Sequence, residues 1–221
     1  MSEEKSFSAQ GMAVRTATIL FIFVIIFTAS LSAAYLWTKP AIEASAAQEK
    51  MKLVDEVLSR SEYDNALLDD TLTLPATTAL GLDEPSTLYR ARRAGQPLAI
   101  IFEAVAPDGY AGKVRLLIAL RTDGSIAGIR VTQHKETPGL GDYIDPKKDK
   151  NKKNPWISQF QNLAYASIAD KEWKVKKDGG HFEYYAGATV SPRAVVKAIH
   201  KAVRWANEQG DALYAPTGAA K

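Results

Sequence analysis

The centre of the chain carries the stretch VRLLIALRTDGSIAGIRVTQ, residues 114–133. It contains two runs rich in aliphatic and β-branched residues, at 114–121 and 126–133, which is typical of strands. The pair Asp123-Gly124 between them is a turn signal. Strands joined by so short a connection pair in antiparallel fashion. The stretch therefore predicts two neighbouring antiparallel strands.

The same pattern extends upstream. Residues 87–93 and 98–105 have strand character, and they are bounded by Ala94-Gly95 and by Pro107-Asp108-Gly109. Residues 67–85, interrupted by prolines and a glycine, have room for one further short strand. These segments predict an antiparallel meander, and the fold class is α+β.

Downstream of the meander, three kinds of element are expected. A short helix should open at Pro155 and Trp156 and run to Leu163, and strands should occupy residues 171–175 and 181–185. A long amphipathic helix should follow from Pro192, because apolar residues recur there at helical spacing. The sheet is therefore expected to have flanking helices.

A long uncharged stretch lies near the N-terminus. Ala17 to Trp37 are 21 residues without a charge, and at about 1.5 Å per residue they can cross a hydrocarbon core of about 30 Å. We expect a single transmembrane helix with Tyr35 and Trp37 as interfacial anchors. The alternative is a cleaved signal peptide, whose apolar region is usually shorter. The flanking charges do not decide the orientation.

These features divide the chain into five expected segments. Residues 1–16 form a short, disordered N-terminus, 17–37 the transmembrane helix and 38–60 an amphipathic stalk helix. Residues 61–210 form the globular domain. The last residues, 211–221, are expected to be a flexible tail.

Composition excludes several classes of function. The chain of 221 residues has a net charge of +3 and no cysteine, so it has no disulfide, thiolate-bound iron–sulfur cluster or cysteine-bound zinc. A basic stripe with interleaved aromatics, typical of nucleic-acid binding, is missing from the sequence. The histidines, His134, His181 and His200, lack the spacing of metal ligands. We expect no catalytic site, no metal and no nucleic acid.

A small-residue turn precedes the long C-terminal helix, in the stretch Glu183-Tyr-Tyr-Ala-Gly-Ala-Thr-Val-Ser-Pro-Arg193. Ser191 followed by Pro192 predicts an N-cap and a first helical position. The free N–H groups and the dipole of a helix start favour an anion such as phosphate. From the residues alone, an ordinary loop-to-helix connection is the favoured interpretation of this junction.

Two stretches resemble one family. Gly187-Ala188-Thr189 is similar to the end of the flavinylation motif, Asp-x-x-Ser/Thr-Gly-Ala-Thr, of the FMN-binding domain in the G subunit of Rnf (Rsx) electron-transport complexes. Glu183 stands in place of the Asp, and Ala186 in place of the hydroxyl residue. His134-Lys-Glu-Thr-Pro-Gly-Leu-Gly141 resembles the second signature of the same family.

The resemblance implies a cofactor and a location. It implies FMN attached covalently through its phosphate to Thr189, by a separate flavin transferase. The residues that it places at the cofactor are Thr189, Gly187, Ala188, Ser191, Glu136, Thr137 and Leu140. It further implies a single-pass protein of a bacterial inner membrane, with the FMN-binding domain in the periplasm.

The partners implied by the resemblance are the other membrane subunits of the complex. The function implied is electron transfer in ion-translocating ferredoxin–NAD oxidoreduction, with sodium or proton as the ion. Two alternatives stay open: the C subunit of a sodium-translocating NADH:quinone reductase, and a membrane-anchored scaffold domain that has lost flavin.

A lysine-rich run, residues 146–155, follows the second signature. We expect it to be a solvated loop. The functional alternative is docking to an acidic face of a partner subunit or to anionic headgroups, in which case the association would be sensitive to salt.

Overall fold

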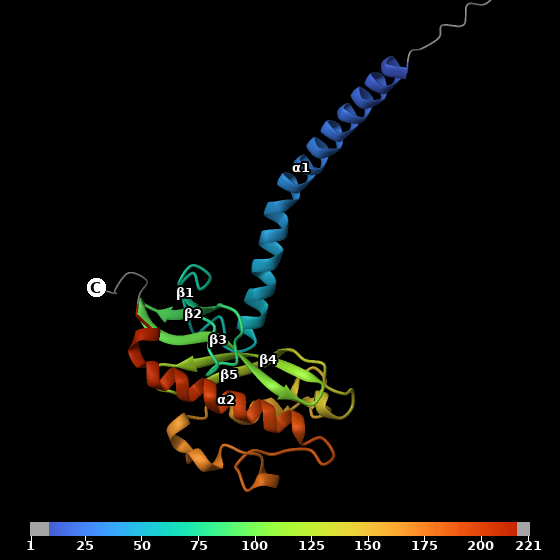
Figure 1. The fold of residues 1–221 in the computed structure, drawn as a ribbon. Helices are drawn as coiled ribbons and strands as arrows, with labels where there is room; N and C mark the ends of the chain where they lie inside the picture. Colours follow the sequence, from blue (N-terminus) through green and yellow to red (C-terminus); the bar gives the residue numbers. More distant parts are fainter. Residues whose placement is uncertain (1–8, 216–221) are drawn as a thin grey trace, which may run out of the picture. The chain divides into compact units, whose positions relative to one another are not determined.

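The computed structural model describes residues 9–215 (Figure 1). The chain divides between Glu49 and Lys50 into two compact units. The first unit contains most of helix α1, Ala9–Asp55, and the second contains the end of α1, the sheet and helix α2, Val190–Gln209.

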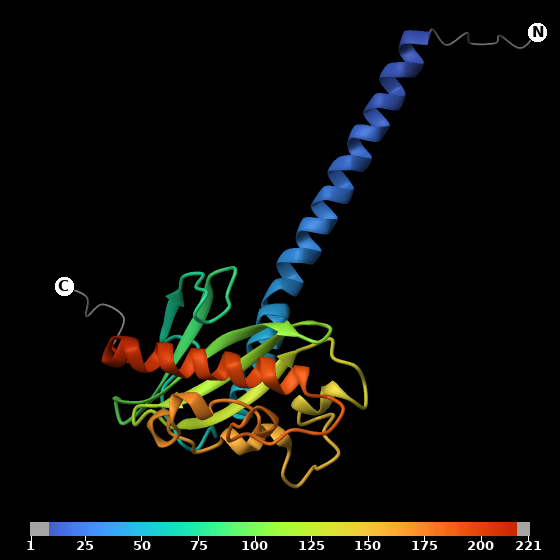
Figure 2. The same ribbon diagram turned by 60° about the horizontal axis from the view of Figure 1, so that its bottom comes forward.

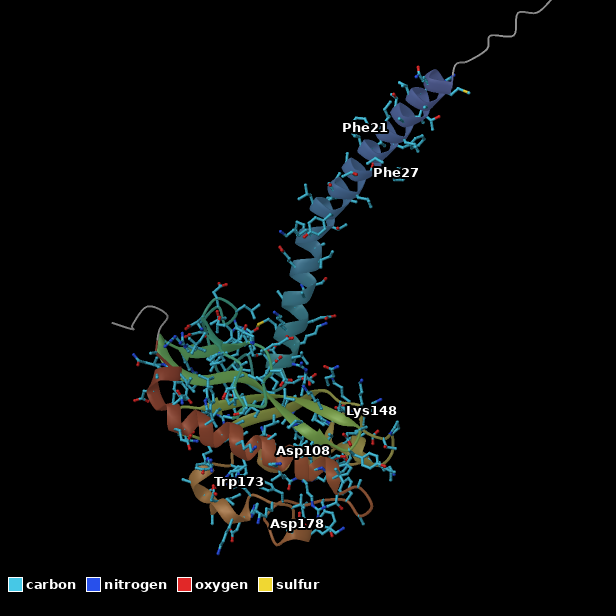
Figure 3. All side chains as sticks on the ribbon, viewed as in Figure 1. Phe21, Phe27, Asp108, Lys148, Trp173 and Asp178 are labelled. Atoms are coloured by element: carbon cyan, nitrogen blue, oxygen red, sulfur yellow. The ribbon has the colours of Figure 1, made fainter. Side chains whose placement is uncertain are left out.

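Helix α1 contains the expected membrane span. Its apolar side chains between Ile19 and Leu36 are exposed, among them Phe21 and Phe27, which Figure 3 labels. The helix is long and apolar enough to cross a membrane. An apolar helix with exposed side chains is suited to a lipid environment, because lipid removes its side chains from water.

The bounds of α1 differ from those expected. The helix begins at Ala9, so residues 9–16 are helical rather than disordered, while residues 1–8 lie outside the described part. No break separates the span from the stalk, since α1 continues through Pro40 and ends at Asp55 instead of residue 60. Proline fixes a helical φ and removes one N–H, which long apolar helices tolerate.

The described residues of the second unit form a five-stranded antiparallel meander, as predicted. The strands are β1 Thr71–Leu74, β2 Ser86–Arg93, β3 Gln96–Gly109, β4 Gly112–Arg121 and β5 Ile126–Gln133. They lie in chain order, and every neighbouring pair is antiparallel. In the central register Ile118 pairs with Phe102 on β3 and with Ile129 on β5.

The two faces of the sheet are both buried. Alternate residues of β3 and β4, such as Phe102 and Ile118, belong to the core that includes α2, which crosses the sheet in Figure 2. The residues between them, such as Ile101 and Ala119, pack with Val54 from the end of α1. The period of two in a strand produces this division, because successive side chains point to opposite faces.

The segment between β5 and α2 differs from the prediction. Five 3-10 helices occupy it within the described residues: Gly141–Ile144, Trp156–Phe160, Tyr165–Ser167, Asp170–Glu172 and Lys176–Asp178. The short helix expected to reach Leu163 is a 3-10 helix that ends at Phe160.

The prediction of strands at 171–175 and 181–185 is wrong. Their apolar residues Trp173, Val175 and Phe182 are buried together in the core, and Val175 and Phe182 form an isolated parallel bridge. The alternation of lysines with apolar residues therefore arises from anchoring in the core and not from a sheet.

The expected flexible tail is ordered at its beginning. Gly210–Leu213 form a 3-10 helix, and Leu213 is buried. The Leu213 carbonyl accepts a hydrogen bond from Arg90 Nε at 2.8 Å, and the Tyr214 hydroxyl donates to the Arg121 carbonyl at 3.0 Å. These bonds fasten residues 213 and 214 to β2 and β4. Residues 216–221 lie outside the described part.

Candidate functional site

The start of α2 forms one wall of the candidate site. The helix begins at Val190, and Thr189 occupies the N-cap position with φ −93° and ψ −21°. The prediction of Ser191 as N-cap is wrong, because the Ser191 hydroxyl donates to Glu136 Oε2 at 2.5 Å instead of bonding the helix backbone. The side chain of Thr189 makes no capping hydrogen bond.

The first turn of α2 has unused donors. Arg193 N–H bonds back to the Thr189 carbonyl at 3.2 Å, and Pro192 has no N–H to offer. The N–H groups of Val190 and Ser191 precede the first intrahelical bond, as in any α-helix. Together with the helix dipole they favour an anion beside Thr189.

Thr189 lies at a cavity of about 210 Å³. The cavity brings together all the residues expected at the cofactor, from both sequence stretches. They are Thr189, Gly187, Ala188, Ser191, Glu136, Thr137 and Leu140. Thr189 itself is only 8% exposed. The sequence analysis did not assign three further lining residues, Tyr110, Gly141 and Val190, to the cofactor.

Glu136 joins the loop after β5 to the helix. Its carboxylate is buried, and besides Ser191 it accepts the Ala111 N–H at 3.3 Å. Gly141 makes the close approach possible, since a Cβ at this position would lie 2.4 Å from Ser191 Oγ. A buried carboxylate needs such donors, because its desolvation is otherwise costly. Glu136 therefore fixes the position of both walls.

Tyr143 fixes the turn before Thr189. Its hydroxyl donates to the Ala188 carbonyl at 3.0 Å and accepts the Tyr185 N–H at 3.1 Å. Burial raises the pKa of Tyr143 to about 12, so the hydroxyl stays protonated and can donate at neutral pH. Sequence reasoning missed this residue, because a tyrosine in a loop gives no signal of a long-range hydrogen bond.

Asp149 organises the lysine-rich loop. The lysines of this loop are exposed, as expected, but Asp149 is 0% exposed. Its carboxylate accepts the Trp156 N–H at 2.6 Å, the Asn151 N–H at 2.9 Å and the Tyr185 hydroxyl at 3.2 Å. The loop is thus linked through Tyr185 to the turn that precedes Thr189.

A second cavity of about 160 Å³ adjoins this network. It shares Leu140 and Ala188 with the first cavity. Its other lining residues are Gly139, Asp142, Tyr143, Lys148, Lys150, Tyr185 and Ala186. The two cavities therefore adjoin each other at Leu140 and Ala188.

The histidines serve local structure. His134 Nδ1 accepts the Glu136 N–H at 3.2 Å, and His200 Nε2 lies 2.7 Å from Asp170 Oδ1. His181 is exposed and packs edge-on against Phe182. Within residues 9–215, no three His, Asp or Glu side chains gather as a metal site would require.

The site fits a phosphorylated flavin in its chemistry. The cavity combines a hydroxyl and free N–H groups at a helix start with apolar side chains from Leu140, Val190 and Tyr110. The hydroxyl and the N–H groups suit a phosphate, and the apolar side chains suit an aromatic ring system.

Comparison with known proteins gives matches over both units. Residues 109–204 match the FMN-binding domain family, and residues 8–57 match the family of the RnfG N-terminal region. The chain is 40% identical to the G subunit of the ion-translocating oxidoreductase complex of Pseudomonas aeruginosa over 206 residues, 93% of this chain and 94% of that protein.

Two other relatives carry the same name. The protein of Shewanella baltica is 40% identical over 194 residues, which cover 88% of this chain and 89% of the relative. The protein of Vibrio cholerae is 35% identical over 200 residues, which cover 90% and 93%. The similarity therefore extends over nearly the whole length of each chain.

Proposed function

The chain belongs to the family of G subunits of ion-translocating oxidoreductase complexes, and we propose that its FMN-binding domain carries FMN covalently on Thr189. The bond would be a phosphoester between the flavin phosphate and Thr189 Oγ1. One observation carries this proposal: the residues of two separate signatures line one cavity, and Thr189 lies in it at the start of α2.

The residues of the cavity have distinct roles in this proposal. Val190 and Ser191 offer N–H groups to the phosphate, and the helix dipole favours its charge. Leu140 and Val190 cover apolar ring surface, while Tyr143 and Glu136 hold the two walls. FMN when bound supplies reversible electron transfer, and the chain supplies position and electrostatics.

Attachment requires a second protein. No side chain among residues 9–215 is hydrogen-bonded to the Thr189 hydroxyl in a way that would activate it, and a free hydroxyl is a poor nucleophile. A flavin transferase would cleave the diphosphate of FAD, so that Thr189 Oγ1 bonds the FMN phosphorus and AMP leaves. The hydroxyl proton would pass to a base of the transferase.

The location of the chain and its partners in the membrane also belong to this proposal. Helix α1 anchors the chain in the inner membrane, the short N-terminus is cytoplasmic, and the FMN-binding domain is periplasmic. There it relays electrons within a complex of Rnf type that couples ferredoxin–NAD oxidoreduction to sodium or proton movement. The match to the RnfG N-terminal region and the apolar helix support this placement.

Mass spectrometry tests the covalent bond. The full chain, coexpressed with a flavin transferase, should stay yellow after denaturation and be heavier by one FMN. Thr189→Ala should abolish both properties. Thr137→Ala removes the other threonine hydroxyl of the cavity and should keep the added mass. An unmodified Thr189 peptide from cells with an active transferase would refute the proposal.

Thiol labelling tests the orientation. Because the chain has no cysteine, Lys171→Cys introduces a unique thiol on the exposed surface of the domain. A membrane-impermeant reagent should label it in intact spheroplasts. Labelling only after lysis would place the domain in the cytoplasm and refute the periplasmic assignment.

A further inference from the structure

The exposed large apolar side chains of the globular unit gather at the two cavities. In its described residues, 50–215, four such side chains are exposed: Tyr110 (69%), Leu140 (54%), Val190 (43%) and Tyr185 (39%). Tyr110 and Val190 line the first cavity, Tyr185 lines the second, and Leu140 lines both. Large exposed apolar side chains concentrated at one place mark an interaction site.

Positive charge borders the same place. The loop of residues 147–153 carries five exposed lysines, of which Lys148 and Lys150 line the second cavity. Lys148 is labelled in Figure 3 at the edge of the globular unit. Lys147 pairs with Glu56 at 3.3 Å. Within residues 9–215 the other lysines of the loop make no ion pair with a carboxylate.

Asp149, the one acidic residue of 147–153, makes no ion pair with these lysines within the described residues. Its carboxylate is fully buried and is occupied by two backbone N–H groups and the Tyr185 hydroxyl. The acid therefore holds the loop from inside, while Lys148, Lys150 and Lys153 face solvent. A surface with an apolar centre and a charged border is typical of protein interfaces.

We propose that the second cavity, with Leu140 and Tyr185 in its wall, and this lysine loop form the docking surface for an acidic protein partner that exchanges electrons with the flavin in the first cavity. This inference rests on the proposed function, since it places the partner where FMN would be reached. Aspartate and glutamate side chains on the partner would face the lysines. Such complementarity raises the rate of association and fixes the orientation of the partner.

The shape of the site favours a protein over a membrane surface. The second cavity is concave, and its lining comes from three separate segments, residues 139–143, 148–150 and 185–188. An amphipathic helix can bind a membrane by inserting its apolar face into the bilayer, but residues 147–153 are not helical. A protruding group of the partner can enter a cavity, whereas a bilayer surface cannot.

Site-directed cross-linking in the complete membrane complex tests the docking surface. Lys153→Cys, in the cysteine-free chain, carries a photoreactive probe in the loop but outside both cavities. It should cross-link to an acidic segment of another subunit of the complex. The yield should fall severalfold at high salt, because exposed charges are then screened.

Charge reversal gives the matched comparison. Lys148→Glu with Lys150→Glu should lower the cross-linking yield by about tenfold at low salt. Lys174→Glu with Lys177→Glu changes the charge equally at exposed lysines that line neither cavity, and it should change the yield less than twofold. Equal yields in both double variants, or a yield independent of salt, would overturn the proposal.

Two other outcomes would also overturn it. Adducts to phospholipid that disappear in membranes of neutral lipid would assign the lysines to anionic headgroups. Loss of FMN mass from the Lys148→Glu, Lys150→Glu variant would assign them to the flavin site. The Thr189→Ala variant should keep the cross-link. If the wild-type chain proved to lack covalent FMN, the proposed function would be refuted, but the cross-linking measurement would still test the docking surface.

Discussion

The sheet and the segment between β5 and α2 are held together in different ways. In the sheet, apolar side chains are buried on both faces, and alternate residues of a strand, such as Phe102 on β3 and Ile118 on β4, face the core that includes α2. In the segment, 3-10 helices are held by buried apolar side chains such as Phe160 and Phe182 and also by buried polar groups, chiefly the Tyr143 hydroxyl and the carboxylates of Asp149 and Glu136. The sheet depends mainly on the volume of its side chains, whereas the segment depends in addition on which atom is a donor and which an acceptor.

This difference teaches where each kind of substitution is harmful. Apolar exchanges of similar volume cost little in a core, so the sheet should accept many sequences. A buried polar group that loses its partner keeps its full desolvation cost. The segment that carries Thr189 should therefore respond to isosteric changes that leave its shape intact.

The largest expected effect lies in the sheet. Phe102 is fully buried and packs against Trp205, so Phe102→Ala should lower the free energy of unfolding by about 3 to 5 kcal/mol. Guanidinium unfolding of the detergent-solubilised chain, followed by tryptophan fluorescence, measures the change. Tyr110→Ala, at an exposed aromatic residue, should cost no more than about 0.5 kcal/mol. Similar losses in both variants would contradict the assigned core.

The next largest loss of stability is expected at Asp149, where the change replaces an acceptor atom by a donor. Asp149→Asn keeps the volume but turns an NH₂ group toward donors, so it should cost about 1 to 3 kcal/mol. Limited proteolysis should then cut the lysine loop more rapidly. Asp69→Asn, at an exposed aspartate, is the matched control. If the two variants were equally stable, the distinction between the two regions would fail.

A smaller effect is expected at Tyr143. Tyr143→Phe removes the hydroxyl that bonds Ala188 and Tyr185, and should cost about 1 to 2 kcal/mol. The looser turn should also lower the fraction of chains that acquire FMN during coexpression. Unfolding curves and intact mass measure the two quantities. An unchanged flavin yield would show that the turn does not need this hydroxyl.

The same tyrosine predicts a dependence on pH. Burial raises the pKa of Tyr143 to about 12, above the value of about 10 for an exposed tyrosine. The folded state therefore binds the proton more tightly, and this stabilisation is complete below pH 10 and lost as the pH rises toward 12. Tyr143→Phe should reduce the loss. Tyr214, whose pKa burial also raises to about 12, should account for part of the remainder.

The smallest effect is expected at Glu183. Its side chain forms an exposed pair with Lys176, whereas its backbone carbonyl accepts the Trp156 indole N–H at 2.6 Å. Glu183→Gln should therefore change the free energy of unfolding by less than about 0.5 kcal/mol. A loss as large as that of Asp149→Asn would show that this exposed pair helps to hold the segment.

Prediction from the sequence was better for the sheet than for the segment, for a physical reason. The strands 87–93, 98–105, 114–121 and 126–133 were located by apolar alternation and turn residues, which are local signals. Trp173 and Val175 are buried on either side of the exposed Lys174, and this spacing imitated strand alternation. The contacts of Asp149 join residues up to 36 positions apart, and no periodicity reports such contacts.

The candidate site was predicted from short stretches with characteristic residues. The residues that these stretches assigned to the cofactor line one cavity. The predicted capping residue was wrong, because Ser191 bonds to Glu136 and Thr189 occupies the N-cap position. That bond links residues 55 positions apart. Tyr143 was missed for the same reason.

Gly187 shows what kind of constraint acts on the turn before Thr189. Its φ is +90°, yet a Cβ at this position would have no neighbour within 4 Å. The requirement is thus one of chirality and not of size, since any L-amino acid would carry a similar backbone strain of about 1 to 2 kcal/mol. A D-alanine introduced here by chemical ligation should favour this φ, where L-alanine opposes it.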